Sequence, residues 1–517
     1  MKKTVFLISG LILFLSACDK NDDDGGEVKT GEVELNNEVN EFIWKGLNHW
    51  YFWQEDVPNL ADTKDDDQDA FYTYLNSIKT TGDANTTEEA LFNSLIYKPD
   101  VVDDFSWFID DVAEQLASFN GISTTYGITR GPLVRVGTTD NVVQVIGSVA
   151  AGSPAEAAGL KRGDIISKVD GEVMTVDNYI IINKLYTQES VTLGLATVSE
   201  TDEVTQTEEK SITAQELSIN PVLHTSVIEE GGRKIGYLVY EGFRGTYNGE
   251  LNDAFGELKA AGINELILDF RYNGGGSVLT SALLASMIYG EANPYIQGSS
   301  NGDVFAELRY NSKRSAENNS VYPFFQDVFL YDKNTGNQSG ATAMNRLTGI
   351  TRLYVIGTER TASASEMIIN GLRPYIPVKV IGEKTKGKNE GSITVVDAPK
   401  GSRDEPYTDT DNRSTKHTVG MQPIVFQIYN ANNESDYTNG FVPDIEVIEY
   451  QYYKNIKPYG DTTDPLLRAA LDDMLGTAGK FDLQKDTNAA KVTKGVTYPK
   501  FSSEMYIMPN DIKPTSK

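Results

Sequence analysis

The spacing of apolar and polar residues divides the chain into regions with different periods. Between residues 37 and 117 the apolar residues recur three and four positions apart, which predicts a small helical domain. Between 118 and 200 short β-rich runs alternate with turns, which predicts a β-rich domain. Between 220 and 450 apolar strands alternate with helical stretches, the pattern of an α/β domain. The stretch 451–517 contains one short helical run, 465–475, and no motif, so we expect it to pack on the α/β domain or to form a loose tail.

The two sheet-containing regions can be divided into individual elements. In the β-rich region the predicted strands are 134–136, 142–146, 164–169 and 190–195. A short helix from Pro154 to Leu160 is predicted among them, because Ser153 can cap it and proline suits a first helical position. In the α/β region the predicted strands are 234–240, 265–270, 352–356 and 378–381, and the predicted helices are 247–260, 278–289 and 366–372. Residues 200–215 are polar and should form an exposed hairpin or loop.

The first residues have the pattern of a secretory signal. Two lysines precede an apolar run from Val5 to Leu15, which is too short to cross a bilayer as a helix. The run ends in Leu-Ser-Ala-Cys, which resembles the lipobox of bacterial lipoproteins, where the signal is cut before the cysteine. We therefore expect a signal peptide at 1–17, a lipidated Cys18 and a flexible acidic tether at 18–36. The protein would be extracytoplasmic and anchored by lipid, with the outer membrane favoured.

Composition and charge narrow the possible functions. Acidic residues outnumber basic ones 74 to 46, for a net charge of −28, so we expect no nucleic-acid partner. Three histidines and one cysteine leave little for a metal site, and we expect neither a metal nor a cofactor. All four tryptophans lie in the helical region. They could form a sugar-binding surface, but an aromatic stripe at helical spacing is more often core.

A stretch of the β-rich region resembles a PDZ domain. It reads GSPAEAAGLKRGDII (152–166) and matches the helix-turn-strand signature of that family. PDZ domains bind a peptide as an added edge strand and hold its carboxylate with the backbone N–H groups of a loop. The resemblance places that loop at Tyr126, Gly127 and Ile128, and it implies protein or peptide partners with a free C-terminus.

Two strand-to-helix junctions of the α/β region are suited to catalysis. Such junctions place free backbone N–H groups at a helix start, where they can stabilise an oxyanion. The first is LDFRYNGGG (268–276), whose three glycines would let the backbone approach a ligand closely. The second is TASASE (361–366), which offers Ser363 and Ser365 as nucleophiles. A structural alternative for the second junction is a capping box, with Ser363 as N-cap and Glu366 three residues later.

The residues alone leave several candidates for the base that would activate a serine. His224 and His417 are the histidines of the α/β region, and neither lies in a turn that suggests catalysis. A lysine can replace histidine when its amine is neutral. The predicted strand 378–381 leads into the turn GEKTKGK (382–388), which contains three lysines. Each of these lysines is a possible base.

The order of these motifs resembles the carboxyl-terminal processing peptidases, also called tail-specific proteases. The resemblance rests on 269–276, 361–366, 382–388 and GFVPDI (440–445), and with the PDZ-like stretch it covers about 120–450. It implies an α/β core of the crotonase/ClpP-like type. It also implies a serine endopeptidase that binds the C-terminal ends of proteins through its PDZ domain and hydrolyses peptide bonds.

The resemblance also implies roles for individual residues. The nucleophile of the family corresponds to Ser363 and its base to Lys388. The N–H groups of Ala364 and Gly275 would hold the oxyanion of an acyl transfer. Judged from the residues alone, three alternatives stay open: Lys384, Lys386 and Ser365.

Two positions depart from the family pattern. Ser392 stands where the family often has a glutamine that orients the lysine, and Lys386 stands where an aromatic residue is usual. A serine can still accept a hydrogen bond from an ammonium group, but only at closer approach. These departures motivate an alternative function, a non-catalytic peptide-binding lipoprotein on the same fold.

Overall fold

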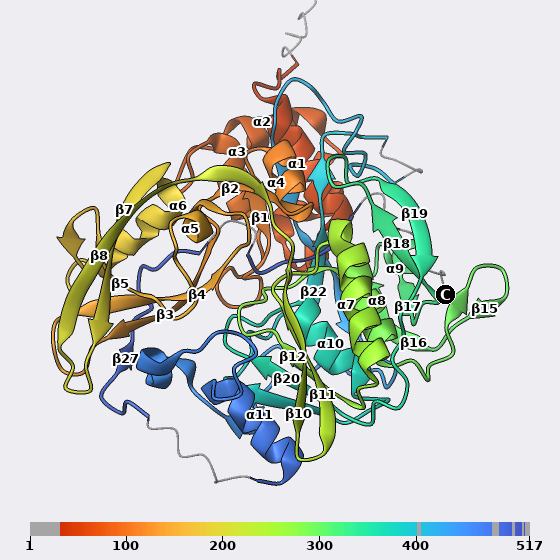
Figure 1. Cartoon of the computed structure of the whole chain (residues 1–517). Helices are drawn as coiled ribbons and strands as arrows, with labels where there is room; N and C mark the ends of the chain where they lie inside the picture. Colours follow the sequence, from red (N-terminus) through yellow and green to blue (C-terminus); the bar gives the residue numbers. More distant parts are fainter. Residues whose placement is uncertain (1–31, 401–404, 478–484, 499–501, 509–510, 512–517) are drawn as a thin grey trace, which may run out of the picture.

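The computed structural model describes residues 32–400, 405–477, 485–498, 502–508 and 511 of the chain. An N-terminal helical region and a curved β-rich region flank a core of helices and sheets (Figure 1). The predicted class, a multidomain α/β protein with a helical N-terminal region and a β-rich region, is confirmed.

The N-terminal region is helical, and its central tryptophans are core. Its helices are α1 (Glu38–Trp50), α2 (Gln68–Asn76), α3 (Thr87–Ser94) and α4 (Val112–Phe119), with 3-10 turns at Gln54–Asp56, Pro58–Leu60 and Asp62–Asp65. Each helix begins after a side chain that accepts a hydrogen bond from its first turn: Asn37, Asp67, Thr86 and Asp111. Trp44 and Trp50 are buried on α1. The aromatic stripe is therefore a packing surface.

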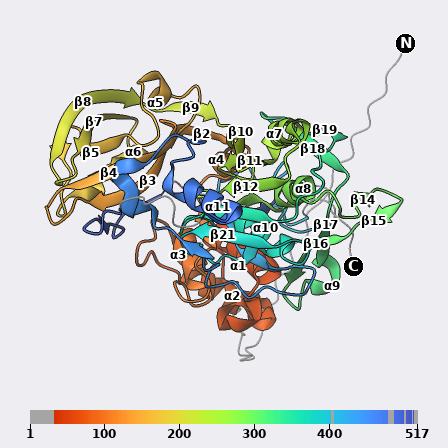
Figure 2. The same cartoon turned by 60° about the horizontal axis from the view of Figure 1, so that its bottom comes forward.

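The β-rich region is a strongly curved sheet (Figure 2). In spatial order its strands are β27 (Ala490–Lys491), β3 (Ile128–Arg135), β4 (Val142–Val149), β5 (Ile165–Val169), β7 (Ser190–Val198) and β8 (Val204–Thr213), and β6 (Glu172–Val173) pairs with β5. The polar stretch 200–215 contains the turn and the second strand of the hairpin of β7 and β8. The helical elements are α5 (Pro154–Ala157), the 3-10 helix η4 (Tyr179–Asn183) and α6 (Lys184–Thr187). Ser153 caps α5 as predicted, but the helix is shorter because Gly159 then adopts a φ of +79°.

The central sheet of the core is mostly parallel. In spatial order its strands are β10 (Val222–Glu230), β11 (Arg233–Tyr240), β12 (Glu265–Asp269), β20 (Leu353–Gly357), β21 (Val378–Gly382) and β26 (Ile445–Glu446). Only β10 is antiparallel to its neighbour. The helices α7 (Asn248–Ala261), α8 (Val278–Ile288) and α10 (Ala364–Leu372) cover one face, and α11 (Pro465–Leu475) covers the other. Alternate strand residues point to the two faces, so both are apolar.

A second sheet was not predicted from the sequence. In spatial order its strands are β13 (Gly276–Ser277), β28 (Met505–Ile507), β22 (Glu390–Ile393), β25 (Ile424–Tyr429), β16 (Val304–Tyr310) and β17 (Ser320–Pro323). The smaller elements are β1 (Trp107–Ile109) with β24 (Gly420–Gln422) and β23 (Val395–Val396), β2 (Ile122–Thr125) with β9 (Gln215–Ser218), β14 (Tyr295–Ile296) with β15 (Ser300–Asn301), β18 (Asp327–Tyr331) with β19 (Gln338–Ala343), and α9 (Ser315–Asn318). The strand β28 comes from the last stretch of the chain, which therefore packs on the core.

Candidate active site

The three predicted motifs meet at one edge of the central sheet. Strands β12, β20 and β21 are parallel neighbours, so their carboxyl ends lie at the same edge. The glycine loop follows β12, the TASASE segment follows β20, and the lysine-rich turn follows β21. The topology thus gathers chemical groups that lie far apart in the sequence.

Ser363 has the geometry of a nucleophile. It precedes α10 with a φ of 65°, a left-handed value that is strained for a residue with a Cβ. Its side chain is fully buried, and among the described residues its Oγ has no hydrogen-bond partner. The alternative nucleophile, Ser365, donates its hydroxyl to the Asn273 carbonyl oxygen at 3.1 Å. The unengaged hydroxyl is therefore that of Ser363.

The carboxylate of Glu366 joins Ser363 to the lysine-rich turn. One oxygen, Oε2, accepts the N–H of Ser363 at 2.9 Å and the N–H of Lys388 at 2.8 Å. The other, Oε1, accepts the Gly387 N–H at 2.7 Å and the Thr385 hydroxyl at 2.6 Å. Burial raises the pKa of this carboxyl, while these hydrogen bonds oppose the rise. The predicted capping box of Ser363 and Glu366 is present, and Glu366 also fixes the backbone of the proposed base.

The three lysines of the turn differ in burial. Lys384 and Lys386 are exposed, whereas Lys388 is fully buried. The Lys388 ammonium group lies 4.6 Å from the centre of the Phe105 ring. It donates to the Ser503 carbonyl oxygen at 3.0 Å and to Glu504 Oε2 at 3.2 Å. Of the three, Lys388 is the one enclosed in the site, and its amine is turned toward the last stretch of the chain.

The glycine loop lies against Ser363. Gly275 has a φ of +114°, and a Cβ on it would come within 2.6 Å of the Ser363 Cβ, so only glycine fits. Its N–H donates to Asn273 Oδ1 at 2.9 Å. The next N–H, that of Gly276, donates to the Glu504 carbonyl oxygen at 2.5 Å. In this structure the N–H that donates to a peptide carbonyl is that of Gly276, whereas the N–H of Gly275, the residue that the resemblance implied, donates to a side chain. The Ala364 N–H belongs to the first residue of α10 and so has no partner within the helix.

A buried ion network supports the glycine loop from behind. Arg271 pairs with Asp269 at 2.6 Å, with Asp464 at 3.0 Å and with Glu449 at 3.1 Å. Burial alone would raise the pKa of Asp464, but Arg271 and Arg162 outweigh it and lower that pKa. These charges compensate one another, and removal of one would leave its partners buried and unpaired. The network positions the loop and makes no contact that we assign to substrate.

Ser392 does not take the place of the family's glutamine at the lysine. Its hydroxyl donates to the Met505 carbonyl oxygen at 3.0 Å and accepts from Gln422 Nε2 at 2.9 Å. The Lys388 ammonium instead donates to Ser503 and Glu504. Sequence reasoning did not single out Phe105, Gln422 or Glu504. They lie far from the motifs along the chain, and no local pattern identifies them.

The histidines lie in other interactions. His224 is hydrogen-bonded to Ser226 at 2.9 Å on β10, and burial lowers its pKa. His417 lies 3.2 Å from Asp397. Both histidines are thus hydrogen-bonded to partners outside the three motifs that meet at Ser363. The lysine remains the candidate base.

The predicted carboxylate loop lies at the start of β3. Tyr126 is buried and donates its hydroxyl to the Gln188 carbonyl oxygen at 2.6 Å. The Gly127 N–H donates to Thr125 Oγ1 at 3.1 Å, and Ile128 is the first residue of the strand. The loop thus leads directly into β3, and its role in binding a carboxylate stays a prediction.

The predicted signal peptide and Cys18 lie outside the described residues. Over the described ranges, none of the helices combines the length and the apolar character that a membrane span requires. In the same ranges, no three histidine, cysteine, aspartate or glutamate side chains are grouped as a metal ion would need.

Comparison with known families matches this architecture segment by segment. The model of Peptidase family S41 matches residues 234–447, that of the Peptidase S41 N-terminal domain matches 38–107, and that of a PDZ domain matches 145–182. The fold is thus that of an S41-type protein with an accessory PDZ domain. The chain belongs to peptidase family S41.

Individual relatives support the same assignment. The chain is 27% identical to the chloroplastic C-terminal processing peptidase of Tetradesmus obliquus over 268 residues, 50% of each protein. It is 25% identical to the carboxyl-terminal-processing protease of Synechocystis over 259 residues, 50% of this chain and 52% of that one. It therefore spans about half the length of these curated relatives. A crystal structure from Bacteroides fragilis, assigned to the S41 proteases, superposes with a TM-score of 0.62 at 27% identity, over 84% of this chain and 97% of that one.

Proposed function

We propose that this protein is a serine endopeptidase that uses a Ser-Lys pair and acts on proteins near their C-terminal ends. One observation carries the proposal: a single buried carboxylate, Glu366, binds the backbone N–H groups of both Ser363 and Lys388. An unengaged hydroxyl and a buried amine are thereby fixed to one rigid frame. Membership of the S41 family supports the same chemistry.

The proposed reaction uses Ser363, Lys388 and the N–H groups beside them. The neutral amine of Lys388 takes the proton of Ser363 Oγ as the oxygen attacks the peptide carbonyl carbon. The Ala364 N–H and an N–H of the glycine loop stabilise the oxyanion that forms. Lys388 then protonates the leaving amine, and an acyl-enzyme remains on Ser363. A water molecule that gives its proton to Lys388 hydrolyses this ester. Before the first step, the amine must leave Ser503 and Glu504.

The PDZ domain would select the substrate. PDZ domains bind an extended peptide along an edge strand. In this proposal that strand would be β3, which has Tyr126, Gly127 and Ile128 at its start. A protein held by its C-terminal end beside this strand would present a nearby segment to Ser363. The names of the two curated relatives, both C-terminal processing enzymes, agree with this mode of action.

A serine-reactive phosphonate tests the proposal directly. We expect mass spectrometry to find an adduct on Ser363 of the full-length protein, and to find none in Ser363→Ala or Lys388→Ala. The matched variant Ser365→Ala, which loses only a hydrogen bond to Asn273, should still be labelled. If Ser363 stays unlabelled in the wild type and in every folded variant that keeps Ser363 and Lys388, although peptides bind, the alternative of a non-catalytic peptide-binding protein replaces this proposal.

We also propose that the protein is held to the outer membrane by a lipid on Cys18, on the extracytoplasmic side. The lipobox-like sequence before Cys18 and the acidic, apolar-poor stretch after it support this location. Cys18→Ser should move the protein from the membrane fraction to the soluble fraction. Membrane association that persists in this variant would contradict the anchor.

A further inference from the structure

We propose that the tail segment, residues 485–498 and 502–508, is a built-in inhibitor that fills both the PDZ groove and the active-site groove. The inference rests on the proposed peptidase function, because it concerns access to the same site. It is carried by the contacts of the two parts of the tail segment, one with the PDZ domain and one with the residues around Ser363.

The second part of the tail segment is a strand in the active-site groove. β28 lies between β13 and β22 and runs parallel to both, with Met505 opposite Gly276 and Tyr506 opposite Ser392. Gly276 donates its N–H to the Glu504 carbonyl oxygen at 2.5 Å, and Ser392 donates its hydroxyl to the Met505 carbonyl oxygen at 3.0 Å. The strand register and the Gly276 bond are those of a peptide bound by strand addition, and the Ser392 side chain adds a further bond to its backbone. A substrate strand cannot occupy the same place.

The same part of the tail segment holds the proposed base. The Lys388 amine donates to the Ser503 carbonyl oxygen at 3.0 Å and to the Glu504 carboxylate at 3.2 Å. Burial raises the pKa of Glu504 to about 7, although Lys388 acts against the rise. The amine binds these two acceptors and makes no hydrogen bond with the Ser363 hydroxyl, which has no hydrogen-bond partner among the described residues. The tail segment therefore blocks the chemistry as well as the groove.

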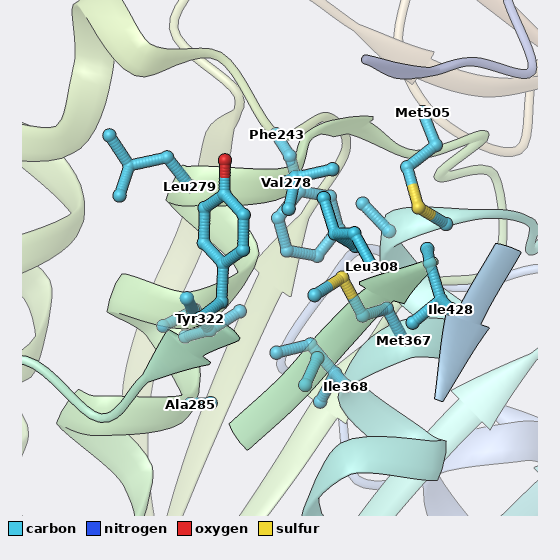
Figure 3. Packing of buried hydrophobic residues seen from close by; sticks show 14 of the residues in the cluster. Phe243, Val278, Leu279, Ala285, Leu308, Tyr322, Met367, Ile368, Ile428 and Met505 are labelled. Carbon is cyan, nitrogen blue, oxygen red and sulfur yellow. The ribbon is translucent and has the colours of Figure 1, made fainter. Parts of the chain in front are cut away.

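Apolar contacts secure this part of the tail segment. Met505 is fully buried in a cluster with Val278, Met367 and Ile428 (Figure 3). The ring of Tyr506 stacks on Phe119, with ring centroids 3.7 Å apart. Full burial of a methionine side chain contributes about 1.5–3 kcal/mol. A competing peptide must offer a similar side chain to displace it.

The first part of the tail segment pairs with the edge of the PDZ sheet. β27 is antiparallel to β3, with Lys491 opposite Val134. The Val492 N–H continues the ladder by donating to the Leu133 carbonyl oxygen at 3.0 Å. An added strand beside β3 is the position that a peptide ligand of this domain would take.

The opposite wall of the PDZ groove also binds the tail segment. From η4, Tyr179 donates its hydroxyl to the Lys494 carbonyl oxygen at 2.7 Å, and Asn183 donates its Nδ2–H to the Gly495 carbonyl oxygen at 2.8 Å. Val496 packs against the apolar core of the domain. The tail segment thus lies between β3 and η4, in contact with both walls.

Covalent linkage makes this inhibition effective. The two grooves are filled by neighbouring stretches of one chain, so each part keeps the other at a high effective concentration. A peptide that binds one groove alone must compete with an intramolecular strand. A substrate that engages both grooves displaces both parts, which couples substrate capture by the PDZ domain to opening of the active site.

A reversible disulfide tests the inference. Ile393 of β22 and Ile507 of β28 are paired across neighbouring strands, whose Cα separation suits a disulfide. In the full chain carrying Cys18→Ser, which removes its one native cysteine, Ile393→Cys with Ile507→Cys should close on oxidation. We expect phosphonate labelling of Ser363 to be at least tenfold slower in the oxidised than in the reduced protein. Each single-cysteine variant should label equally in both conditions.

A variant that should release the tail segment from the active-site groove tests the opposite effect, faster labelling of Ser363. Met505→Glu places a charge in the apolar cluster and should speed Ser363 labelling at least fivefold. The matched variant Ile296→Glu makes the same change on an exposed hairpin and should label at the wild-type rate. Should Met505→Glu fail to fold, the oxidised and reduced forms of the double-cysteine variant decide the question alone.

The outcomes separate the two proposals. Equal labelling of the oxidised and reduced double-cysteine protein overturns the inhibitory role of the tail segment, while the peptidase function stands. A complete lack of Ser363 labelling, in the reduced protein and in folded Met505→Glu alike, contradicts the peptidase function instead.

Discussion

The PDZ groove and the active-site groove bind the same tail segment in different ways. In the PDZ groove, residues 490–497 are exposed or half-buried and are held mainly by hydrogen bonds to their backbone. In the active-site groove, Met505 and Tyr506 are buried among apolar side chains. A hydrogen bond that can exchange with water contributes about 1 kcal/mol, whereas a fully buried apolar side chain contributes about 1.5–3 kcal/mol.

Because the two grooves hold the tail segment by different interactions, we expect them to release it with different ease. The part of the tail segment in the PDZ groove is the easier one for a peptide to displace, because a peptide can replace its hydrogen bonds one for one. The part in the active-site groove is harder to displace, because its buried apolar side chains would have to leave a cluster from which water is excluded. Opening should therefore begin at the PDZ groove, and the active site should open last.

The largest expected effect is at the proposed base. Lys388→Met keeps the length of the side chain but removes the proton acceptor, so hydrolysis should fall by at least about 10³-fold. The assay compares Lys388→Met with its parent in the Met505→Glu background, where the tail segment no longer blocks the groove. A loss of less than tenfold would contradict the role of Lys388.

The matched control for Lys388→Met is the same substitution at a lysine in the PDZ groove. Lys491 lies on β27 and pairs with Glu359 at 2.7 Å. Lys491→Met in the same background should change hydrolysis less than threefold, since it removes a charge but no reacting group. If both lysine variants lose activity equally, the division of tasks between the grooves is wrong.

The next effect is on stability. Gly276 has a φ of +136°, and a Cβ there would overlap the Phe243 carbonyl oxygen. Gly276→Ala should lower the free energy of unfolding by about 3 kcal/mol, through backbone strain together with the clash. Gly171 in the β-rich region has a φ of +79° with open space around its Cβ position, so Gly171→Ala should cost about 1 kcal/mol. Denaturant unfolding measures both, and equal losses would show that the close approach at Gly276 does not constrain the site.

Much of the fold could be predicted because its elements are long and periodic. The helix 465–475 has the predicted limits, and the strand-helix alternation of the core is as expected. The second sheet was missed because its strands are short and pair across large sequence separations. The three-residue strand β28 is the extreme case, since no pattern in three residues identifies a partner.

Only part of the candidate site could be predicted from the sequence. Parallel topology explains why the motifs after β12, β20 and β21 converge, and the resemblance led to Ser363 and Lys388. The sequence could not show that Lys388 is buried whereas Lys386 is exposed, because that depends on packing against Phe105 and the tail segment. Nor could it show which glycine N–H faces a peptide, because this depends on the φ angles of Gly275 and Gly276.

A smaller effect is a pH dependence at the active-site groove. Burial raises the pKa of Glu390 to about 8, against the attraction of Lys388 and with repulsion from Asp103 and Asp104. The folded protein then keeps this carboxyl protonated at pH values where the unfolded chain, with an ordinary pKa near 4.5, has lost the proton. Stability from this group is complete below about pH 4.5 and is lost as pH rises toward 8, by up to about 1.4 kcal/mol per pH unit.

The variant Glu390→Gln isolates that dependence. Glutamine stays neutral in both states, so the decline in melting temperature between pH 5 and pH 8 should be shallower than in the wild type. Glu317→Gln, an acid-to-amide change on an exposed side chain, should leave the wild-type slope unchanged. Parallel curves for wild type and Glu390→Gln would mean that Glu390 is ionised in the folded protein.

The smallest expected effect tests whether the two grooves release the tail segment independently. Tyr179→Phe removes one exposed hydrogen bond to the Lys494 carbonyl oxygen, which contributes about 1 kcal/mol or less. Amide hydrogen exchange of residues 490–497 should become up to about fivefold faster, while that of 505–507 stays as in the wild type. Tyr289→Phe, outside both grooves, should change neither. If Tyr179→Phe accelerates exchange equally in both parts, the tail segment leaves as one cooperative unit, and the active site opens together with the PDZ groove rather than after it.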